Sequence, residues 1–158
     1  MKRTIAPTSL VIAFATVFVL DVLPTAQAGE HRECSNASLR GSFGFTSIGT
    51  LLALPPPFAG PFAEIGRQTF DGRGTTDATA TLSANGNIVK GVTAQGTYEV
   101  NPDCTGSMTL FILPFASTAN LDFVIDDDGA ELRAIVTDAG AVESRIYRKQ
   151  FLQGHKER

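Results

Sequence analysis

The chain offers few side chains of the kinds that carry nucleophilic catalysis. Its two histidines, His31 and His155, lie near its ends, and none lies within residues 32–154. A Ser-His-Asp or Cys-His site needs a histidine base within hydrogen-bond reach of the nucleophile, and zinc sites use histidine or cysteine ligands. We therefore expect no catalytic triad, no metal site and no cofactor.

Carboxylates and their polar neighbours are the remaining candidates for chemistry. Strand alternation along residues 63–73 places Glu64 and Gln68 on the same face as Phe70, with Arg67 on the opposite face. A buried carboxylate with a raised pKa can act as a general base. The residues that a polar pocket would draw on are Glu64, Arg67, Gln68, Tyr98, Glu99 and Arg133. The alternative is that these groups are rim or surface charges, except Tyr98, which we expect to be buried with its hydroxyl needing a partner.

Three consecutive aspartates, at 126–128, are followed by Gly129. Neighbouring side chains on a strand point in alternate directions, and the spacing does not match a helix-loop-helix calcium loop. We predict a polar hairpin turn here rather than a calcium site.

The first 28 residues have the pattern of an export signal. Lys2 and Arg3 precede an apolar run at residues 10–20, and residues 26–28 have the small-x-small pattern of a cleavage site. Such a run spans roughly 16 Å as a helix, about half of a bilayer core. We predict a signal peptide at 1–28, a single domain at 29–149 and a charged tail at 150–158, in a protein that is periplasmic or secreted. An uncleaved membrane anchor is the alternative.

The charge of the chain argues against a nucleic-acid partner. Removal of the signal would shift the net charge from −3 to −4, because Lys2, Arg3 and Asp21 leave with it. The remaining basic residues are scattered, whereas nucleic-acid binding requires a basic patch or stripe. We expect no nucleic-acid partner and no stable membrane insertion after signal cleavage, and the sequence carries no signal for an oligomeric state.

Cys34 and Cys104 are the two cysteines of the chain. In an oxidising compartment a disulfide between them is expected. A catalytic thiol would need a nearby histidine base, which this region lacks. The predicted disulfide closes a loop of about 70 residues, worth about 3–5 kcal/mol by the chain-entropy estimate.

Short stretches with strand-like alternation follow one another from Leu39 to Lys149. Asn85-Gly86 is the strongest hairpin signal between them, because type I′ turns need positive φ at both central residues. The expected strands are residues 39–49, 63–73, 74–83, 88–100, 107–113, 119–126, 131–137 and 141–149. This pattern predicts an all-β fold with a single closed antiparallel barrel of about eight strands in meander order. Side chains either just fill such a barrel or leave room for one small ligand.

Residues 50–62 interrupt this rhythm. Four prolines, at 55, 56, 57 and 61, oppose a regular strand or helix, yet leucine and phenylalanine are frequent here. Three interpretations remain open: a plug that closes one end of the core, a lid over a ligand, or a contact patch for a partner.

Several phrases together resemble a known group of barrels. The chain is similar to small exported bacterial proteins in five segments: TFDGRG at 69–74, SANG at 83–86, GTYEVNPDCTGS at 96–107, DFVIDDDG at 122–129 and TDAG at 137–140. That group resembles the allene oxide cyclase-like barrels of the wider lipocalin-like (calycin) class. The resemblance runs from about Cys34 to Lys149. It implies a closed barrel with an interior cavity, and its relatives include cyclases that hold a flexible apolar substrate in a productive fold.

Three hypotheses about function follow. The first is an exported protein that binds a small apolar ligand inside the barrel, and the second is a cyclase or isomerase that uses the same cavity. The third is a structural or interaction module with a filled core. The candidate ligand-binding residues are Phe43, Phe45, Glu64, Arg67, Gln68, Phe70, Tyr98 and Phe123.

Overall fold

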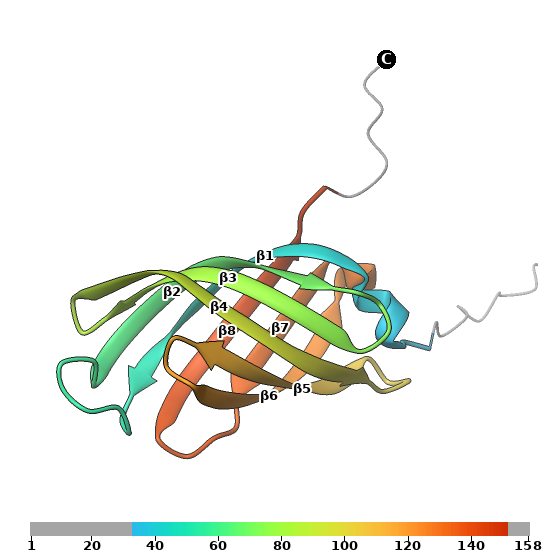
Figure 1. Ribbon diagram of the computed structural model, residues 1–158. Helices are drawn as coiled ribbons and strands as arrows, with labels where there is room; N and C mark the ends of the chain where they lie inside the picture. The colour runs from blue at the N-terminus through green and yellow to red at the C-terminus, as the bar shows by residue number, and fades with distance from the viewer. Residues whose placement is uncertain (1–32, 152–158) are drawn as a thin grey trace, which may run out of the picture. The chain divides into compact units, whose positions relative to one another are not determined.

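In the computed structural model, residues 33–151 are described, and they form one closed antiparallel barrel (Figure 1). The eight strands follow one another around the wall, and β8 pairs with β1 to close it. The all-β meander barrel predicted from the sequence is therefore confirmed. The strands are β1 (Gly41–Leu51), β2 (Gly60–Phe70), β3 (Thr75–Ala84), β4 (Asn87–Val100), β5 (Thr105–Leu113), β6 (Ser117–Asp126), β7 (Glu131–Val136) and β8 (Ala141–Lys149).

Two short 3₁₀ helices accompany the strands. The first, η1 (Asn36–Leu39), precedes β1, and the second, η2 (Asp127–Gly129), joins β6 to β7. Leu39 was expected to begin a strand, but it ends η1 with its side chain fully buried against the core. Packing at the end of the barrel thus decides the conformation of a residue whose alternation alone suggests a strand. The aspartate run forms the turn at η2, as predicted.

The second strand begins three residues earlier than expected. Pro61 lies within β2, opposite Thr50 of β1, and its carbonyl accepts a hydrogen bond from the Asn85 backbone N–H at 2.8 Å. A proline near the first residue of a strand lacks only a donor, so its carbonyl can still pair. The irregular segment between β1 and β2 is therefore only residues 52–59.

The β3–β4 hairpin turns at Asn85 and Gly86, with φ of 46° and 84°. These are the positive values that a type I′ turn requires, so the hairpin prediction is confirmed. Further along, the register shifts between Ala80 and Thr81 of β3, and Gly91 is the extra residue on β4. Such a bulge bends a strand and increases its twist, which helps a sheet to close into a barrel.

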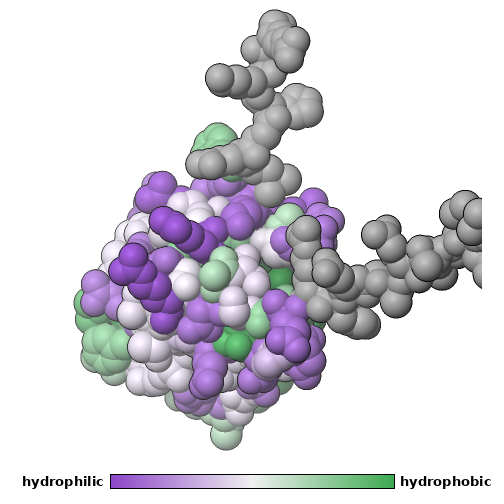
Figure 2. Space-filling view, turned by 90° about the vertical axis from the view of Figure 1, so that its right-hand side faces the viewer, coloured by the Kyte–Doolittle hydropathy of each residue, from purple (hydrophilic) through white to green (hydrophobic). Residues whose placement is uncertain are grey.

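One end of the barrel is closed by η1 and a disulfide. Cys34 is bonded to Cys104, with Cα atoms 5.0 Å apart, as the sequence predicted. The Tyr98 hydroxyl accepts a hydrogen bond from the Gly72 backbone N–H at 2.9 Å and donates one to the Asn36 carbonyl at 3.2 Å. Tyr98 is therefore buried with its hydroxyl satisfied, and it ties η1 to the barrel wall. Figure 2 looks onto this end, where hydrophilic residues surround small groups of hydrophobic ones.

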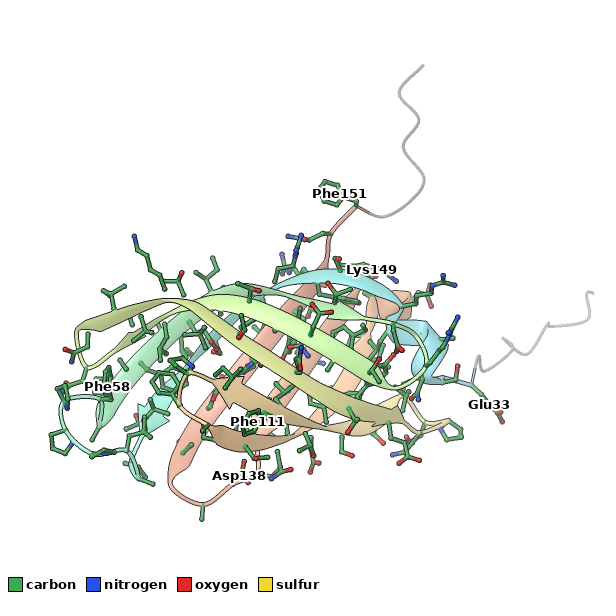
Figure 3. All side chains as sticks on the ribbon, viewed as in Figure 1. Glu33, Phe58, Phe111, Asp138, Lys149 and Phe151 are labelled. Atoms are coloured by element: carbon green, nitrogen blue, oxygen red, sulfur yellow. A yellow bond between two sulfur atoms is a disulfide. The ribbon has the colours of Figure 1, made fainter. Side chains whose placement is uncertain are left out.

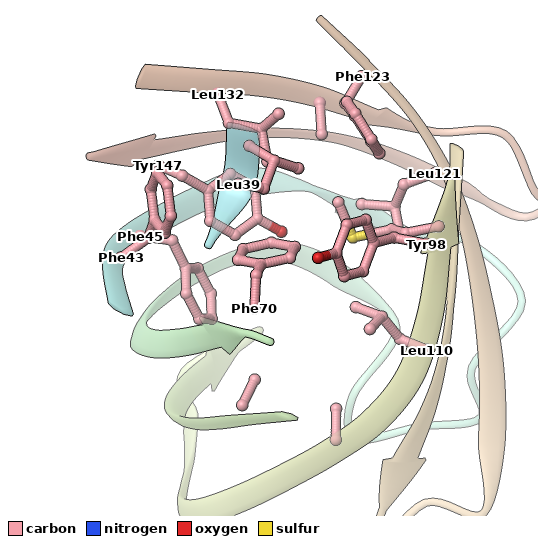
Figure 4. Packing of buried hydrophobic residues seen from close by; sticks show 14 of the residues in the cluster. Leu39, Phe43, Phe45, Phe70, Tyr98, Leu110, Leu121, Phe123, Leu132 and Tyr147 are labelled. Atoms are coloured by element: carbon pink, nitrogen blue, oxygen red, sulfur yellow. The ribbon is translucent and has the colours of Figure 1, made fainter. Parts of the chain in front are cut away.

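The half of the interior beneath this end is filled by large side chains (Figure 4). Phe70 packs edge-on against both Phe43 and Tyr98, with ring centroids 5.4 and 5.1 Å away. Phe45 and Tyr147 meet at 5.3 Å on the neighbouring strands. Gly66 makes room for them, because a Cβ built there would lie 2.8 Å from the Phe45 ring. This half of the barrel has a packed hydrophobic core.

Candidate functional site

The other half of the barrel contains a cavity of about 210 Å³. It lies where β1, β5 and β7 end and where β2, β6 and β8 begin, so it is at the opposite end from η1. Figure 3 shows Phe58, in the segment between β1 and β2, at the far end of the barrel from Glu33. The apolar walls of the cavity include Leu51, Leu54, Phe62, Leu82, Val92, Ile112 and Phe115.

The segment of residues 52–59 contributes to this cavity. Ala53 and Leu54 line it, and the Phe58 ring packs edge-on against Phe115 at 6.1 Å. The backbone N–H groups of Leu52 and Ala53 donate to the Gly140 carbonyl at 2.8 and 3.0 Å, which ties the segment to the β7–β8 loop. The proline-rich segment therefore lies beside the mouth of the cavity.

A cluster of buried polar side chains lies at the inner end of the cavity. The Arg145 guanidinium pairs with Glu143 through Nε and with Glu64 through Nη2, the latter at 3.3 Å. Ser47 donates a hydrogen bond to the same Glu64 oxygen at 3.1 Å. The three charged side chains are only 6–10% exposed. We call Ser47, Glu64, Glu143 and Arg145 the polar cluster.

The register of three strands brings the polar cluster together. Ser47 of β1 lies opposite Glu64 of β2 on one side and opposite Arg145 of β8 on the other. Directly opposed residues on adjacent strands have Cβ atoms about 4.5–5.5 Å apart, so their side chains meet. A one-residue slip of β8 would turn Arg145 outward. The cluster thus depends on the pairing that closes the barrel.

Beyond the polar cluster lies a small void of about 10 Å³. Glu64 and Arg145 line it from the cavity side, and Phe45 lines it from the core. The Arg145 guanidinium carbon is 5.3 Å from the centre of the Phe45 ring, within range of a cation–π interaction. The cluster therefore separates the cavity from the packed core.

Burial raises the pKa of the Glu64 carboxyl above its ordinary value, and the neighbouring Glu143 carboxylate raises it further. Arg145 and the Ser47 hydrogen bond oppose this shift. Burial alone would lower the pKa of Arg145, but the nearby acidic groups, among them the carboxylates of Glu143 and Glu64, raise it overall. Arg145 is therefore a permanent cation, and Glu64 is a carboxyl group that can take up a proton within the barrel.

Tyr147 follows Arg145 on the inward face of β8. Its side chain is fully buried, and its hydroxyl has no hydrogen-bond partner among residues 33–151. Burial raises the pKa of this phenol, and the positive charge of Arg145 opposes the shift. The hydroxyl is therefore a neutral group at physiological pH.

The candidate residues from the sequence fall into three places. Glu64 lines the cavity, and Phe45 lies directly beneath the polar cluster. Arg67 is exposed on the outer face of β2, so it cannot contact a ligand inside the barrel. The other candidates belong to the packed half of the interior: Phe43, Gln68, Phe70, Tyr98 and Phe123. Glu99 and Arg133 border a shallow hollow on the outer wall.

Sequence reasoning missed Glu143 and Arg145, although β8 carries a signal for them. Alternation puts Glu143, Arg145 and Tyr147 on one face, and the other face holds Val142 and Ile146. Hydrophobicity favours burial of the second set, yet Val142 is 64% exposed. Tyr147 lies opposite Phe45, and this pair of aromatic residues decides which face turns inward. On β8 the inward face is charged and the outward face is aliphatic. This reversal of the usual pattern indicates a polar site inside the barrel.

The described part of the chain shows neither a metal-binding group nor a membrane-spanning helix. No group of three or more histidine, cysteine, aspartate or glutamate side chains in residues 33–151 could hold a metal ion. Over the same residues, no helix is long and apolar enough to span a membrane. The predicted signal peptide at 1–28 lies outside the described residues, as does most of the predicted tail.

The barrel resembles a solved structure of a redesigned β-barrel. The two are 13% identical with a TM-score of 0.53, and the match covers 73% of this chain and 95% of the other. At this level of identity the likeness shows the fold alone. No protein-family model and no curated protein matches the sequence.

Proposed function

We propose that this protein binds a small, largely apolar ligand in the cavity between the polar cluster and residues 52–59. The observation that carries the proposal is the cavity itself, with walls formed mainly by leucine, valine, isoleucine and phenylalanine. Ligand sites typically combine such walls with a few polar groups that orient the ligand. Here the polar groups are Glu64, Glu143 and Arg145.

The volume limits the size of the ligand. An apolar cavity of about 150 Å³ is large enough for benzene, whereas drug-sized ligands fill about 300–1,000 Å³. A cavity of about 210 Å³ suits one ring with a short substituent, or a short branched chain. The hypothesis of a filled core predicts no space larger than a water or two, which occupy about 30 Å³ each. The cavity therefore favours the ligand hypothesis.

Two further expectations support an exported binding protein. The Cys34–Cys104 disulfide is consistent with an oxidising, extracytoplasmic location, which agrees with the export signal predicted at residues 1–28. The resemblance to the allene oxide cyclase-like barrels also favours an interior ligand site. The family, the export and the ligand are proposals that rest on this combined support.

Filling the cavity tests the proposal. Ala119 lies on the inward face of β6 and lines the cavity, so Ala119→Phe should occupy the space that a ligand needs. Val124 lies on the outward face of the same strand, and Val124→Phe is the matched control. Binding of neutral one-ring compounds such as 2-phenylethanol would be followed by NMR chemical-shift changes at cavity residues.

The proposal predicts that wild type and Val124→Phe bind such compounds and that Ala119→Phe does not. Overpacking can cost about 1–3 kcal/mol, so the fold of each variant is checked by circular dichroism. Equal binding by all three proteins would place the compounds outside the cavity and refute the proposal.

A second candidate function is an isomerase or cyclase in the same cavity. Glu64 favours it, because a buried carboxyl group with a raised pKa at the end of an apolar cavity can donate or accept a proton. Loss of turnover in Glu64→Gln, with binding retained, would support this reading once a ligand is known. Unchanged turnover of every bound ligand in Glu64→Gln would refute it.

A further inference from the structure

The side chains around the cavity carry more negative than positive charge, and this excess would select among apolar ligands by their charge. Three carboxylates line the cavity, those of Glu64, Asp138 and Glu143, against the single cation of Arg145. The connecting segments at this end, residues 52–59, 85–86, 114–116 and 137–140, contain no other charged residue. An occupant of the cavity therefore meets an excess of negative charge.

Two of the three guanidinium nitrogens of Arg145 are already paired with carboxylates. Nε pairs with Glu143, and Nη2 pairs with Glu64. An incoming carboxylate would add another negative charge beside two that are almost fully buried, where water screens the repulsion only weakly. Pairing of Arg145 with the carboxylate of an organic acid is thus opposed by its own neighbours, Glu64 and Glu143.

A cation in the cavity would instead be attracted by these carboxylates. The ion pairs and the Ser47 hydrogen bond use Oε2 of Glu64 and Oε1 of Glu143. The other oxygen of each carboxylate takes no part in these contacts. Phe62 and Phe115 line the same cavity, and aromatic rings stabilise ammonium groups through cation–π interactions.

We propose that the ligand of this cavity is a small apolar ammonium ion, whose hydrocarbon part packs against the aliphatic walls and whose cationic group faces the Glu64 and Glu143 carboxylates. This inference rests on the proposed function, since it names the charge of the same ligand. It separates this barrel from carriers of fatty acids and other organic acids.

A trio of one-ring compounds that differ mainly in charge provides the test. These are 2-phenylethylammonium, neutral 2-phenylethanol and anionic phenylacetate, titrated into the disulfide-bonded protein at pH 7.5 and low salt, with NMR as the readout. We expect the ammonium ion to bind at least about tenfold more tightly than the alcohol, which corresponds to about 1.4 kcal/mol. Phenylacetate should bind more weakly than the alcohol.

Glu64→Gln keeps the size and the hydrogen-bonding capacity of the side chain and removes its charge. It should reduce the preference for the ammonium ion over the alcohol, measured as the ratio of their two dissociation constants in the same variant. Glu99→Gln removes a carboxylate from the outer wall and is the matched control, expected to match wild type. An unchanged preference in Glu64→Gln would count against the proposed placement of the cationic group.

A pH titration of the wild-type protein provides a second measurement that needs no variant. The groups that face Glu64 are Ser47 on β1, Glu143, Arg145 and Tyr147 on β8, and the apolar Leu82 opposite it on β3. Ionisation of Glu64 makes the cavity more negative, so affinity for the ammonium ion should rise as the pH increases through the raised pKa of Glu64, while affinity for the alcohol stays level.

The outcomes separate this inference from the proposed function. If none of the three compounds binds, the proposed function fails. If the alcohol binds in the cavity and phenylacetate binds as tightly as the ammonium ion or more tightly, the function stands and the inference is overturned.

Discussion

Replacing Arg145 by methionine should destabilise the barrel strongly. Methionine keeps most of the aliphatic length over Phe45 but leaves Glu64 and Glu143 buried without their cation. Removing one partner of a buried ion pair costs about 3–5 kcal/mol. The charge-assisted hydrogen bond from Nε to Glu143 accounts for about 1.5–3 kcal/mol of this. Since domains are stable by about 5–15 kcal/mol, the expected loss of about 4 kcal/mol is a large fraction of the total.

Removing all three charges should restore the lost stability. A triple variant with Glu64→Met, Glu143→Leu and Arg145→Met leaves no charge in the polar cluster. Replacing a buried charge network with apolar residues of similar volume is often neutral or stabilising by about 1–4 kcal/mol. We therefore expect the triple variant to be at least as stable as wild type. It should lose the preference for an ammonium ligand.

Urea unfolding followed by far-ultraviolet circular dichroism suits this chain, because it contains no tryptophan. Arg133→Met is the control, since Arg133 pairs with Asp126 at 2.6 Å on the outer surface and is 57% exposed. An exposed pair contributes about 0–1 kcal/mol. If Arg145→Met unfolds at the same urea concentration as this control, the buried ion pairs do not stabilise the barrel as proposed. If the triple variant is as unstable as the single one, unpaired buried charge is not the cause of the lost stability.

Three further predictions concern other parts of the barrel. Burial raises the pKa of Glu64 above its ordinary value of 4.5, so above about pH 4.5 the folded state holds more protons than the unfolded state, and stability falls as pH rises. Glu64→Gln removes this fall, so urea unfolding should show its stability relative to wild type increasing from pH 4 to pH 8; a constant difference would contradict the shift. Replacing Cys34 and Cys104 by alanine should cost about 4 kcal/mol of stability in urea unfolding, because the disulfide closes a loop of 70 residues. Binding of 2-phenylethanol should be retained. Loss of binding in the folded variant would show that the two ends of the barrel are coupled. Tyr98→Phe should lower the free energy of unfolding by about 1–3 kcal/mol, because the Tyr98 hydroxyl bonds two backbone groups. Tyr147→Phe should be neutral or stabilising in the same assay, because the Tyr147 hydroxyl has no partner in the described part of the chain. Equal losses would show that the two hydroxyls do not differ.

The fold was predictable because its strands and hairpins are specified by residues close together in the sequence. Alternation along β3, β4 and β6 correctly places their inward residues, and Asn85-Gly86 specifies a hairpin from two residues alone. The errors lie at the strand ends. Leu39 is held in η1 by burial against the core, and Pro61 pairs through its carbonyl within β2. Neither outcome can be read from a pattern of alternation.

The candidate site was only partly predictable. Glu64 was identified from its place on a strand that also carries Phe70, but Arg67 was included although it points outward. Glu143 and Arg145 were missed because their strand exposes aliphatic residues and buries charged ones, the reverse of the usual pattern. Phe43, Phe70, Tyr98 and Phe123 are inward as expected, yet they belong to the packed half of the barrel, away from the cavity.

The sequence alone determined the strands, the hairpins, the meander order and the cysteine pair, because alternation and turn residues act over a few neighbouring positions. Only the tertiary structure decided which half of the barrel is filled and which residues meet around the cavity. Ser47 contacts Glu64 and Arg145 because β1 pairs with both β2 and β8, and β8 lies about 100 residues further along the chain. Closure of the barrel sets that register, and the register makes Arg145 and its two carboxylates neighbours.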